Sequence, residues 1–243
     1  MNFNSFLKAG LKTDKITHHG YHRIYPWFLE HYKSKGDLKM LEIGADEMGS
    51  VFLWLDYFPG IKLTIADIEK KEFPGIECIQ LDQSNQVDLF NYAKDKKGYF
   101  DIIVDDGSHV PEHQKLTIEN LWQTLKPGGI YIIEDIETSY WGKSEIYGYN
   151  FNATKSNIIS TFISKLNILN KEFLNSKAFK LDSCDKILNE TEIISFAYNC
   201  IILIKKNVLF HEFYDRKYRY AEAINSKRRK SIFLKLSQFF KIT

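Results

Sequence analysis

Residues 101–109 read DIIVDDGSH, and residues 129–135 read GIYIIED. Each stretch starts as a continuous apolar run, which is typical of a strand that is covered on both faces in a parallel sheet. Each stretch then places acidic side chains where the strand should end. The interior of such a sheet excludes water, so these carboxylates are expected at the edge where the strands end. The role of the carboxylates therefore depends on what that edge binds.

The same kind of apolar run recurs along the first half of the chain. Five strands are predicted, at 38–44, 61–67, 76–82, 99–106 and 129–135. Helices are predicted between them near 49–57, 85–96 and 111–125, and the last of these is expected to stop at LKPGG (125–129). Alternating strands and helices favour an open α/β sheet with right-handed crossovers.

Three further elements complete the predicted fold. Apolar residues at helical spacing predict helices over 21–35 and 157–174, and two strands within 192–206 meet at Asn199 without room for a crossover. We therefore predict a Rossmann-like, doubly wound, mostly parallel seven-stranded sheet with an antiparallel edge hairpin. The predicted organisation is an N-terminal helical segment (1–36), a central domain (37–210) and a basic helical tail (211–243).

The composition allows one substantial core, since 44% of the 243 residues are hydrophobic and 15% aromatic. From Asn207 to the end, nine Lys and Arg face three acidic residues, a formal charge of +6, which leaves −4 for the preceding residues because the total is +2. Two interpretations of this tail stay open: peripheral contact with an anionic membrane, or packing on protein. No nucleic-acid-binding module accompanies the basic run, so we expect no nucleic-acid partner.

The cysteines and the hydropathy pattern favour the cytoplasm. Cys78, Cys184 and Cys200 form no CxxC pair, which buried thiols in a reducing compartment explain most simply. No stretch approaches the roughly 20 apolar residues of a membrane span. The first residues also lack the apolar run of a secretory signal. We expect a cytoplasmic protein without an integral membrane segment.

The predicted strands end in acidic residues, which are Glu42, Asp67, Asp82, Asp105–Asp106 and Glu134–Asp135. In open parallel sheets, ligands bind beyond the carboxyl ends of the strands. Carboxylates on that edge can accept hydrogen bonds from ribose hydroxyls or hold a cation, although each one alone is also explained as a solvated strand end. Five such ends together favour a binding site.

The turn after the first strand indicates the charge of the ligand. LEIGADEMGS (41–50) lacks the G-x-G-x-x-G pattern of a dinucleotide site, and Asp46 and Glu47 would repel phosphates. A positively charged ligand fits better. S-adenosylmethionine carries a sulfonium and an ammonium, and its ribose suits Asp67 at the end of the second strand.

These motifs resemble those of a known family. LEIG with GS at 49–50, ADIE, LDQSN, FDIIVDDGSHVPEHQ, LKPGG and IYIIEDIETSYW are similar to motifs of class I S-adenosylmethionine-dependent methyltransferases. More narrowly, they resemble the metal-dependent sugar O-methyltransferases of the macrolide-sugar type. KTDKITHHGY (12–21) resembles a segment that precedes the domain in those proteins, so the resemblance spans roughly residues 12–206.

Matching positions imply a role for each motif residue. The cofactor-binding residues would be Glu42, Gly44, Asp67, Ile68, Asp82, Gln83, Ser84 and Asp105. Asp106, Glu134 and Asp135 would bind Mg²⁺ or Mn²⁺, and His109 would be the catalytic base. A sugar hydroxyl needs this help because its pKa lies far above that of histidine, and a cation beside it lowers that pKa. The resemblance thus implies that residues 37–210 form a methyltransferase domain.

Some of these residues also have a structural interpretation. His109 could cap the helix that starts near Pro111, and Asp135 could accept hydrogen bonds from backbone amides. His113 stands four residues after His109, but HVPEH lacks the glutamate placement of a zinc protease, so we interpret His113 as loop support or a surface residue. In the loop that follows the fifth strand, Tyr140 and Trp141 could stack on a sugar ring or pack the loop onto the domain. THHG (17–20) could contact the acceptor or a second subunit.

We therefore expect an S-adenosylmethionine-dependent O-methyltransferase that is assisted by a divalent cation and acts on a sugar hydroxyl. The acceptor would be a nucleotide-linked or glycoside sugar of a surface polysaccharide or a secondary metabolite, and we expect a homo-oligomer. One alternative is an iron-dependent hydroxylase on the same fold, although iron sites usually contain two histidines and this site is rich in acids. Another is a binding module without catalytic activity.

Overall fold

The computed structural model describes Lys8 and residues 13–141, 147, 157–173 and 182–207. The predicted tail at 211–243 and most of the loop after Trp141 lie outside these described residues. Within the described part of the chain, no helix is long and apolar enough to cross a membrane. All three cysteines are unpaired, with Cys184 and Cys200 buried.

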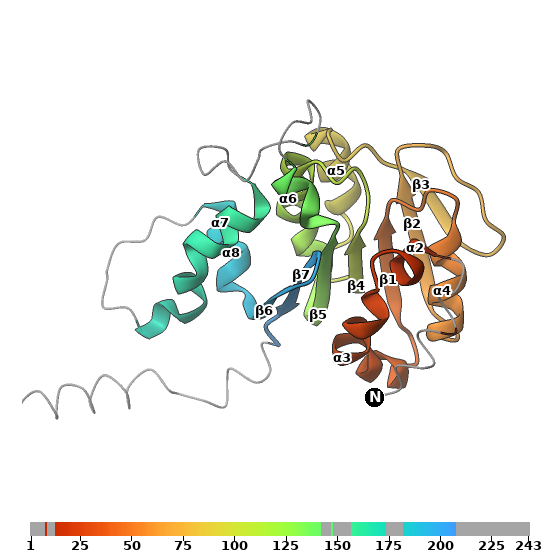
Figure 1. Cartoon of the computed structure of the whole chain (residues 1–243), viewed down its shortest axis with the longest axis horizontal. Coiled ribbons are helices and arrows are strands. Elements are labelled where there is room, and N and C mark those ends of the chain that lie inside the picture. The colour runs from red at the N-terminus through yellow and green to blue at the C-terminus, as the bar shows by residue number, and fades with distance from the viewer. Residues whose placement is uncertain (1–7, 9–12, 142–146, 148–156, 174–181, 208–243) are drawn as a thin grey trace, which may run out of the picture.

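The predicted sheet is confirmed. Seven strands lie in the order β3-β2-β1-β4-β5-β7-β6, with parallel pairing from β3 to β5 and an antiparallel hairpin of β6 and β7 at one edge (Figure 1). The strands are β1 (Lys39–Ile43), β2 (Lys62–Asp67), β3 (Glu77–Gln80), β4 (Phe100–Asp105), β5 (Leu125–Glu134), β6 (Thr191–Ala197) and β7 (Cys200–Lys205). The hairpin turns at Asn199, as predicted, and Asn199 adopts a left-handed backbone conformation with φ of 58°.

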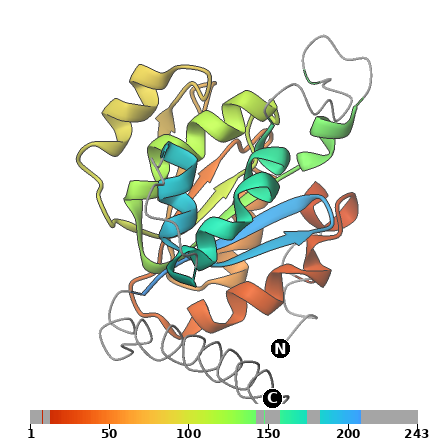
Figure 2. The ribbon, with the colours of Figure 1, turned by 90° about the vertical axis from the view of Figure 1, so that its left-hand side faces the viewer.

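Helices cover both faces of the sheet. They are α2 (Asp14–Thr17), α3 (Tyr25–Leu29), α4 (Gly49–Tyr57), α5 (Gln86–Ala93), α6 (Pro111–Leu121), α7 (Ile158–Lys165) and α8 (Ser183–Asn189). Short 3-10 turns lie at Tyr21–Arg23, Glu30–Ser34, Trp122–Thr124, Ile136–Tyr140 and Leu166–Phe173. Figure 2 shows α7 and α8 in front of the sheet on the side that α6 also covers. The architecture is therefore the doubly wound one that the sequence predicts.

Two apolar clusters, one on each face, hold these layers together. Alternate residues of a strand point to opposite faces, so Met40 joins one cluster and its neighbour Leu41 joins the other. The first cluster contains buried residues of α3 and α4, including Trp54. The second contains buried residues of α5, α6, α7 and α8, including Phe162. Because both faces are covered, the central strands read as continuous apolar runs.

The N-terminal segment is less regular than predicted. Instead of one helix over 21–35, the chain forms a 3-10 turn, the short helix α3 and a second 3-10 turn. Pro26 lies in the first turn of α3, where its missing N–H and its ring prevent a helix from running through from the preceding residues. The segment nevertheless packs into the core, since Tyr21, Tyr25 and Tyr32 are fully buried. It therefore shares one core with the sheet.

The start of β5 also differs from the prediction. Helix α6 and the turn that follows it end at Thr124, and the strand begins at Leu125 instead of residue 129. Leu125 pairs with Phe100, after which the register shifts before Ile102 pairs with Ile130. The PGG sequence at 127–129 thus forms an irregularity within the strand, as is common where Pro and Gly occur in a sheet.

Candidate functional site

A cavity of about 730 Å³ opens beyond the carboxyl ends of the parallel strands. Six of the predicted cofactor-binding residues line it, namely Gly44, Asp67, Ile68, Asp82, Gln83 and Ser84. The other two, Glu42 and Asp105, are fully buried and do not line it. Part of the acidic edge that the strand ends predict, namely Asp67, Asp82, Asp106 and Asp135, therefore lies in the wall of a single cavity.

Gly44 allows the turn after β1 to pass close to the end of β4. Its φ is +81°, a conformation that favours glycine. A Cβ at this position would lie 2.6 Å from Cα of Gly107 and closer still to the carbonyl oxygen of Asp106. The floor of the cavity therefore depends on the absence of a side chain at residue 44.

We expect Gly44→Ala to lower the free energy of unfolding by about 1–3 kcal/mol, because it adds a strained φ and a backbone clash. If the cavity binds S-adenosylmethionine, as the sequence predicts, the variant should also bind it more weakly, because the cavity floor must shift. Gly60→Ala is the matched control, since Gly60 has φ of +84° but nothing within 4 Å of the added Cβ. Chemical denaturation and calorimetry measure the two effects, and equal losses in the two variants would show that the clash at residue 44 is relieved without cost.

Asp67 and Asp82 are fixed at the ends of their strands by local hydrogen bonds. The carboxylate of Asp67 accepts the backbone N–H of Ala45 at 3.0 Å and that of Glu69 at 2.9 Å. Asp82 accepts the N–H and the hydroxyl of Ser84 at 2.8 and 2.7 Å. A carboxylate has about four lone-pair sites, so both can accept further hydrogen bonds from a ligand in the cavity.

Asp105 acts through Gln83. Nε2 of Gln83 donates to Oδ1 of Asp105 at 2.6 Å, and Oε1 of Gln83 accepts the N–H of Ser108 at 2.8 Å. Burial raises the pKa of the Asp105 carboxyl to about 7, and the hydrogen bond from Gln83 opposes this shift. Asp105 thus orients a side chain of the cavity wall.

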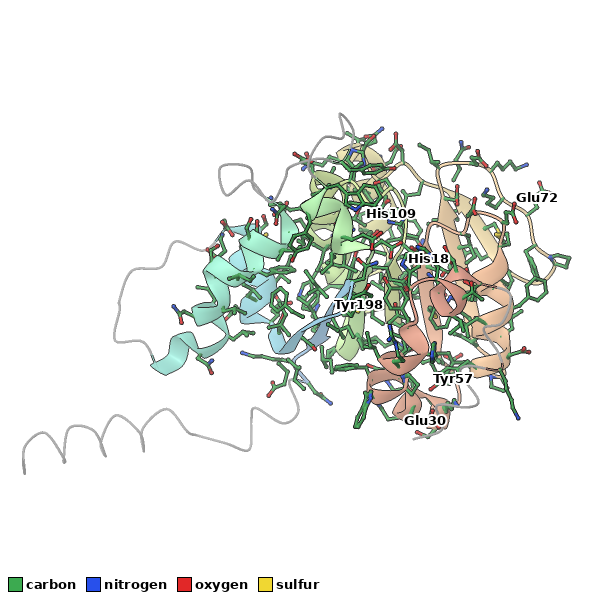
Figure 3. The ribbon with its side chains drawn as sticks, viewed as in Figure 1. His18, Glu30, Tyr57, Glu72, His109 and Tyr198 are labelled. Carbon is green, nitrogen blue, oxygen red and sulfur yellow. The ribbon has the colours of Figure 1, made fainter. Side chains whose placement is uncertain are left out.

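The ligand atoms of Asp106, His109 and Asp135 lie within 4.8 Å of one another. Nε2 of His109 is 3.8 Å from Oδ2 of Asp135, while Nδ1 of His109 is buried without a hydrogen-bond partner among the described residues. In the view of Figure 3, His109 lies between α6 and the N-terminal segment that carries His18. The N-cap of α6 is Val110, with no side-chain hydrogen bond, so His109 does not cap that helix.

Asp135 is held by side chains that the sequence did not connect with it. Its Oδ1 accepts hydrogen bonds from the hydroxyl of Tyr21 at 2.8 Å and from Nδ2 of Asn199 at 2.9 Å, and Nδ1 of His19 lies 3.1 Å away. Its own backbone has φ of 52°. These contacts leave Oδ2 facing His109. The partners of the carboxylate are therefore side chains of the N-terminal segment and the hairpin turn.

Glu134, the third predicted metal ligand, faces a different set of partners. Its Oε2 accepts a hydrogen bond from Nζ of Lys15 at 2.7 Å, and its Oε1 accepts one from the hydroxyl of Tyr25. Nζ of Lys15 also donates to Oδ2 of Asp106 and lies 3.4 Å from Oε1 of Glu42. The structure thus brings Glu134 to Asp106 through a buried lysine instead of placing it beside His109.

The charges of this cluster shift one another's pKa values. Burial raises the pKa of Asp106, Glu134 and Glu42, because an ionised carboxylate is poorly solvated in the interior. Burial alone would lower the pKa of Lys15, but Asp106, Glu134 and Glu42 outweigh it and raise that pKa well above its usual range. Lys15 is therefore an ammonium ion at neutral pH, held among three carboxyl groups.

The two predicted sugar-contacting residues lie beside the cavity. Tyr140 and Trp141 are about half exposed, at 51% and 46%, and neither lines the cavity. Tyr147 does line it, and the ring of Trp141 meets the ring of Tyr147 edge-on with 5.6 Å between centroids. His113 also lines the cavity, and its Nδ1 lies 2.9 Å from Oγ of Ser108, which agrees with the expected role in supporting the loop.

The strand order and the cavity at the carboxyl ends define a Rossmann-like methyltransferase fold. Its likeness to a solved methyltransferase is strong: MycE methyltransferase from the mycinamycin biosynthetic pathway, in complex with Mg and SAH, matches with a TM-score of 0.72 and 25% identity. That match covers 84% of this chain and 53% of MycE. A second structure of MycE, with Mg, SAH and mycinamycin VI, matches with a TM-score of 0.69.

The sequence is similar to curated sugar O-methyltransferases. It is 33% identical over 139 residues to 8-demethyl-8-alpha-L-rhamnosyl tetracenomycin-C 2'-O-methyltransferase of Streptomyces olivaceus, which covers 53% of this chain and 36% of the relative. It is 34% identical over 131 residues to mycinamicin VI 2''-O-methyltransferase of Micromonospora griseorubida, covering 47% of this chain and 33% of the relative. The chain thus spans about a third of the length of these curated relatives. No family model matches it.

Proposed function

We propose that the chain is an S-adenosylmethionine-dependent O-methyltransferase that transfers a methyl group to a sugar hydroxyl with the help of a divalent cation. The observation that carries this proposal is the convergence of Asp106, His109 and Asp135 on the cavity at the strand ends. The similarity to sugar O-methyltransferases supports the reaction class. The acceptor is a nucleotide-linked or glycoside sugar of a surface polysaccharide or a secondary metabolite.

The charge of the cavity suits S-adenosylmethionine. Asp46, Glu47 and Asp67 line it and favour a cationic ligand over a phosphate. Gly44 allows the turn after β1 to pack against the backbone of Asp106 and Gly107 at the floor of the cavity. We propose that Asp67 accepts hydrogen bonds from the ribose, and that Asp82, Gln83 and Ser84 border the rest of the cofactor together with Ile68. Glu42 and Asp105 support this wall from behind.

The acidic cluster suits a hard divalent cation. Asp106 and Asp135 offer carboxylate oxygens, the ligands that Mg²⁺ and Mn²⁺ prefer, and the carboxyl groups of Glu42 and Glu134 lie close by, around Lys15. We propose that Asp106 and Asp135 hold the cation at the cavity, with Glu134 as the third ligand that the resemblance implies.

Only a few groups take part in the proposed methyl transfer. When bound, S-adenosylmethionine supplies an electrophilic methyl group, and the cation lowers the pKa of a nearby hydroxyl. His109 accepts the proton of that hydroxyl, and Asp135, 3.8 Å from Nε2, stabilises the imidazolium that results. Tyr21 and Asn199 keep Asp135 oriented toward His109. Tyr147, with Trp141 against it and Tyr140 nearby, borders the space for the acceptor.

The proposal extends to the organisation and surroundings of the protein. Residues 37–210 contain the whole sheet and so form the methyltransferase domain, while the segment before them completes its site. Unpaired cysteines support a cytoplasmic location. We also propose that the protein forms homo-oligomers.

We expect the purified 243-residue chain to bind S-adenosylhomocysteine in calorimetry and to methylate at least one member of a panel of nucleotide sugars and sugar glycosides, mycinamicin VI included. Mass spectrometry detects the product as a gain of about 14 Da, since one methyl replaces one hydrogen. EDTA should slow the reaction at least tenfold, and added Mg²⁺ should restore it, because the cation lowers the pKa of the hydroxyl. Full activity in EDTA would remove the cation from the mechanism, and failure to bind S-adenosylhomocysteine would overturn the proposal.

A further inference from the structure

A buried ammonium already occupies part of the acidic cluster. The Lys15 side chain is 1% exposed, and Thr13 caps the short helix α2 by accepting the N–H of Lys15 at 3.4 Å. Nζ of Lys15 reaches Oδ2 of Asp106, Oε2 of Glu134 at 2.7 Å and Oε1 of Glu42 at 3.4 Å. Glu42 lies in β1, Asp106 directly follows β4, and Glu134 is the last residue of β5, so one side chain contacts the carboxyl ends of three strands.

Asp106 belongs to two groups at once. One of its oxygens pairs with Lys15, and the residue also forms the cluster with His109 and Asp135. Glu134 is fully engaged, because its second oxygen accepts the hydroxyl of Tyr25. A divalent ion that drew on both Asp106 and Glu134 would therefore have to take oxygens away from the ammonium.

We propose that Lys15 is an internal cation that competes with the divalent ion for Asp106 and Glu134 and so sets the affinity of the site for metal. This inference rests on the proposed use of a divalent cation. In the metal-free protein, the ammonium keeps the neighbouring carboxylates together, which would otherwise repel one another. When the ion binds, part of its binding free energy goes into displacing or repelling the ammonium, so its apparent affinity is lower than the carboxylates alone would give.

The direct test is Lys15→Met, which keeps the apolar length of the side chain and removes its charge. We expect the Kd for Mn²⁺, measured by calorimetry on the metal-free 243-residue protein at fixed pH, to fall at least tenfold. The metal-free variant should also have a lower Tm than the wild type and should gain more in Tm when Mn²⁺ is added. A residue that only supported the fold would leave the affinity unchanged or weaken it when replaced.

Lys71→Met is the matched control. Lys71 lines the cavity, whereas Lys15 is buried behind its wall, and Nζ of Lys71 lies 2.9 Å from Oε2 of Glu69. The control therefore removes one positive charge from the cavity wall, but from a different carboxylate. The Kd for Mn²⁺ should change much less in this control than in Lys15→Met. Equal changes in the two variants would overturn the inference, because the effect would then be general electrostatics.

A second measurement uses the wild type and does not depend on the folding of a variant. Nitrogen-15 NMR of lysine side chains should show a protected ammonium for Lys15 in the metal-free protein, and saturating Mg²⁺ should shift it. An unchanged Lys15 signal in a protein that binds Mg²⁺, or a Kd that is unchanged or higher in Lys15→Met, would refute the competition and leave the proposed function standing. If neither the wild type nor Lys15→Met binds Mn²⁺, the divalent cation has no role in the proposed function, and the proposed competition is refuted as well.

Discussion

Replacing His109 by glycine is expected to lower kcat for methyl transfer by about 10²–10⁴-fold, the range typical of a lost general base. The reason is geometric, since His109 stands with Asp106 and Asp135 at the cavity and its side chain is 28% exposed. Glycine suits this position because His109 has φ of 55°, which costs glycine nothing. Steady-state kinetics with the acceptor found in the screen measures the loss.

Two further results separate a catalytic role from a structural one. Added imidazole should recover part of the lost kcat in His109→Gly, because glycine leaves a hole where the ring was. The Kd for S-adenosylhomocysteine should stay within about threefold of the wild type. His31→Asn is the control, as His31 is an exposed histidine on the 3-10 turn Glu30–Ser34 and does not line the cavity. A loss in kcat below tenfold for His109→Gly, without rescue, would assign the base to another group.

The bounds of the strands could be predicted closely because the burial of a strand determines which residues the strand itself contains. A strand covered on both faces needs a continuous apolar run, and β1, β2 and β4 each begin and end within one residue of the prediction. The acidic edge followed from the same pattern, because parallel strands end at one edge. Helix α8 was not predicted, although Asp182 and Asp185 form a capping box at its start and offered a local signal.

The supporting residues of the site could not be predicted, because nothing local marks them. Lys15 meets Asp106 and Glu134 across 91 and 119 residues of sequence, and a lysine is rarely buried. Tyr21 and Asn199 meet at Asp135 from the two ends of the described chain. Their roles depend on tertiary contacts. The resemblance of KTDKITHHGY to a family segment indicated that this stretch matters, but not which carboxylates it contacts.

The N-terminal segment shows the opposite case. A local signal for one helix was present there, but a proline in the same segment outweighed it. Apolar spacing over 21–35 predicted one helix, but Pro26 interrupts it. The apolar spacing nevertheless predicted the buried positions correctly, since Tyr25, Leu29 and Tyr32 are all buried. Periodicity therefore identified the buried face of the segment, while Pro26 prevents a single helix from running through the start of α3.

The second large effect concerns the buried carboxyl of Asp105. Its pKa of about 7 lies roughly 3 units above the value of about 3.9 in an unfolded chain, because burial penalises the charged form. The sign follows from linkage: a raised pKa means that the folded state holds a proton which the unfolded state has lost, so stability falls as pH rises from about 4 to about 7. Each unit corresponds to about 1.4 kcal/mol, so the loss approaches about 4 kcal/mol.

Asp105→Asn should remove this loss. Asparagine keeps an oxygen for the hydrogen bond from Gln83, whose Nε2 now lies 2.6 Å from Oδ1 of Asp105, and it brings no charge into the interior. The free energy of unfolding of the variant, relative to the wild type, should therefore rise by about 4 kcal/mol between pH 4 and pH 8. Urea denaturation in EDTA measures this difference, and the subtraction of the two proteins cancels groups that titrate in both.

Asp101, on the same strand, is a control with the opposite sign. It is nearly buried, but Lys126 at 2.7 Å, the N–H of Lys39 at 3.0 Å and Lys35 at 3.1 Å outweigh the effect of burial and lower its pKa. Its ionised form therefore stabilises the fold above about pH 4 and loses this effect as pH falls through the lowered pKa. Relative to the wild type, the free energy of unfolding of Asp101→Asn should fall as pH rises, whereas that of Asp105→Asn should rise. If the free energy of unfolding relative to the wild type changed in the same direction with pH in both variants, Asp105 would have to be accessible to water. The Asp105–Gln83 pair could then not be a water-excluded support of the cavity wall.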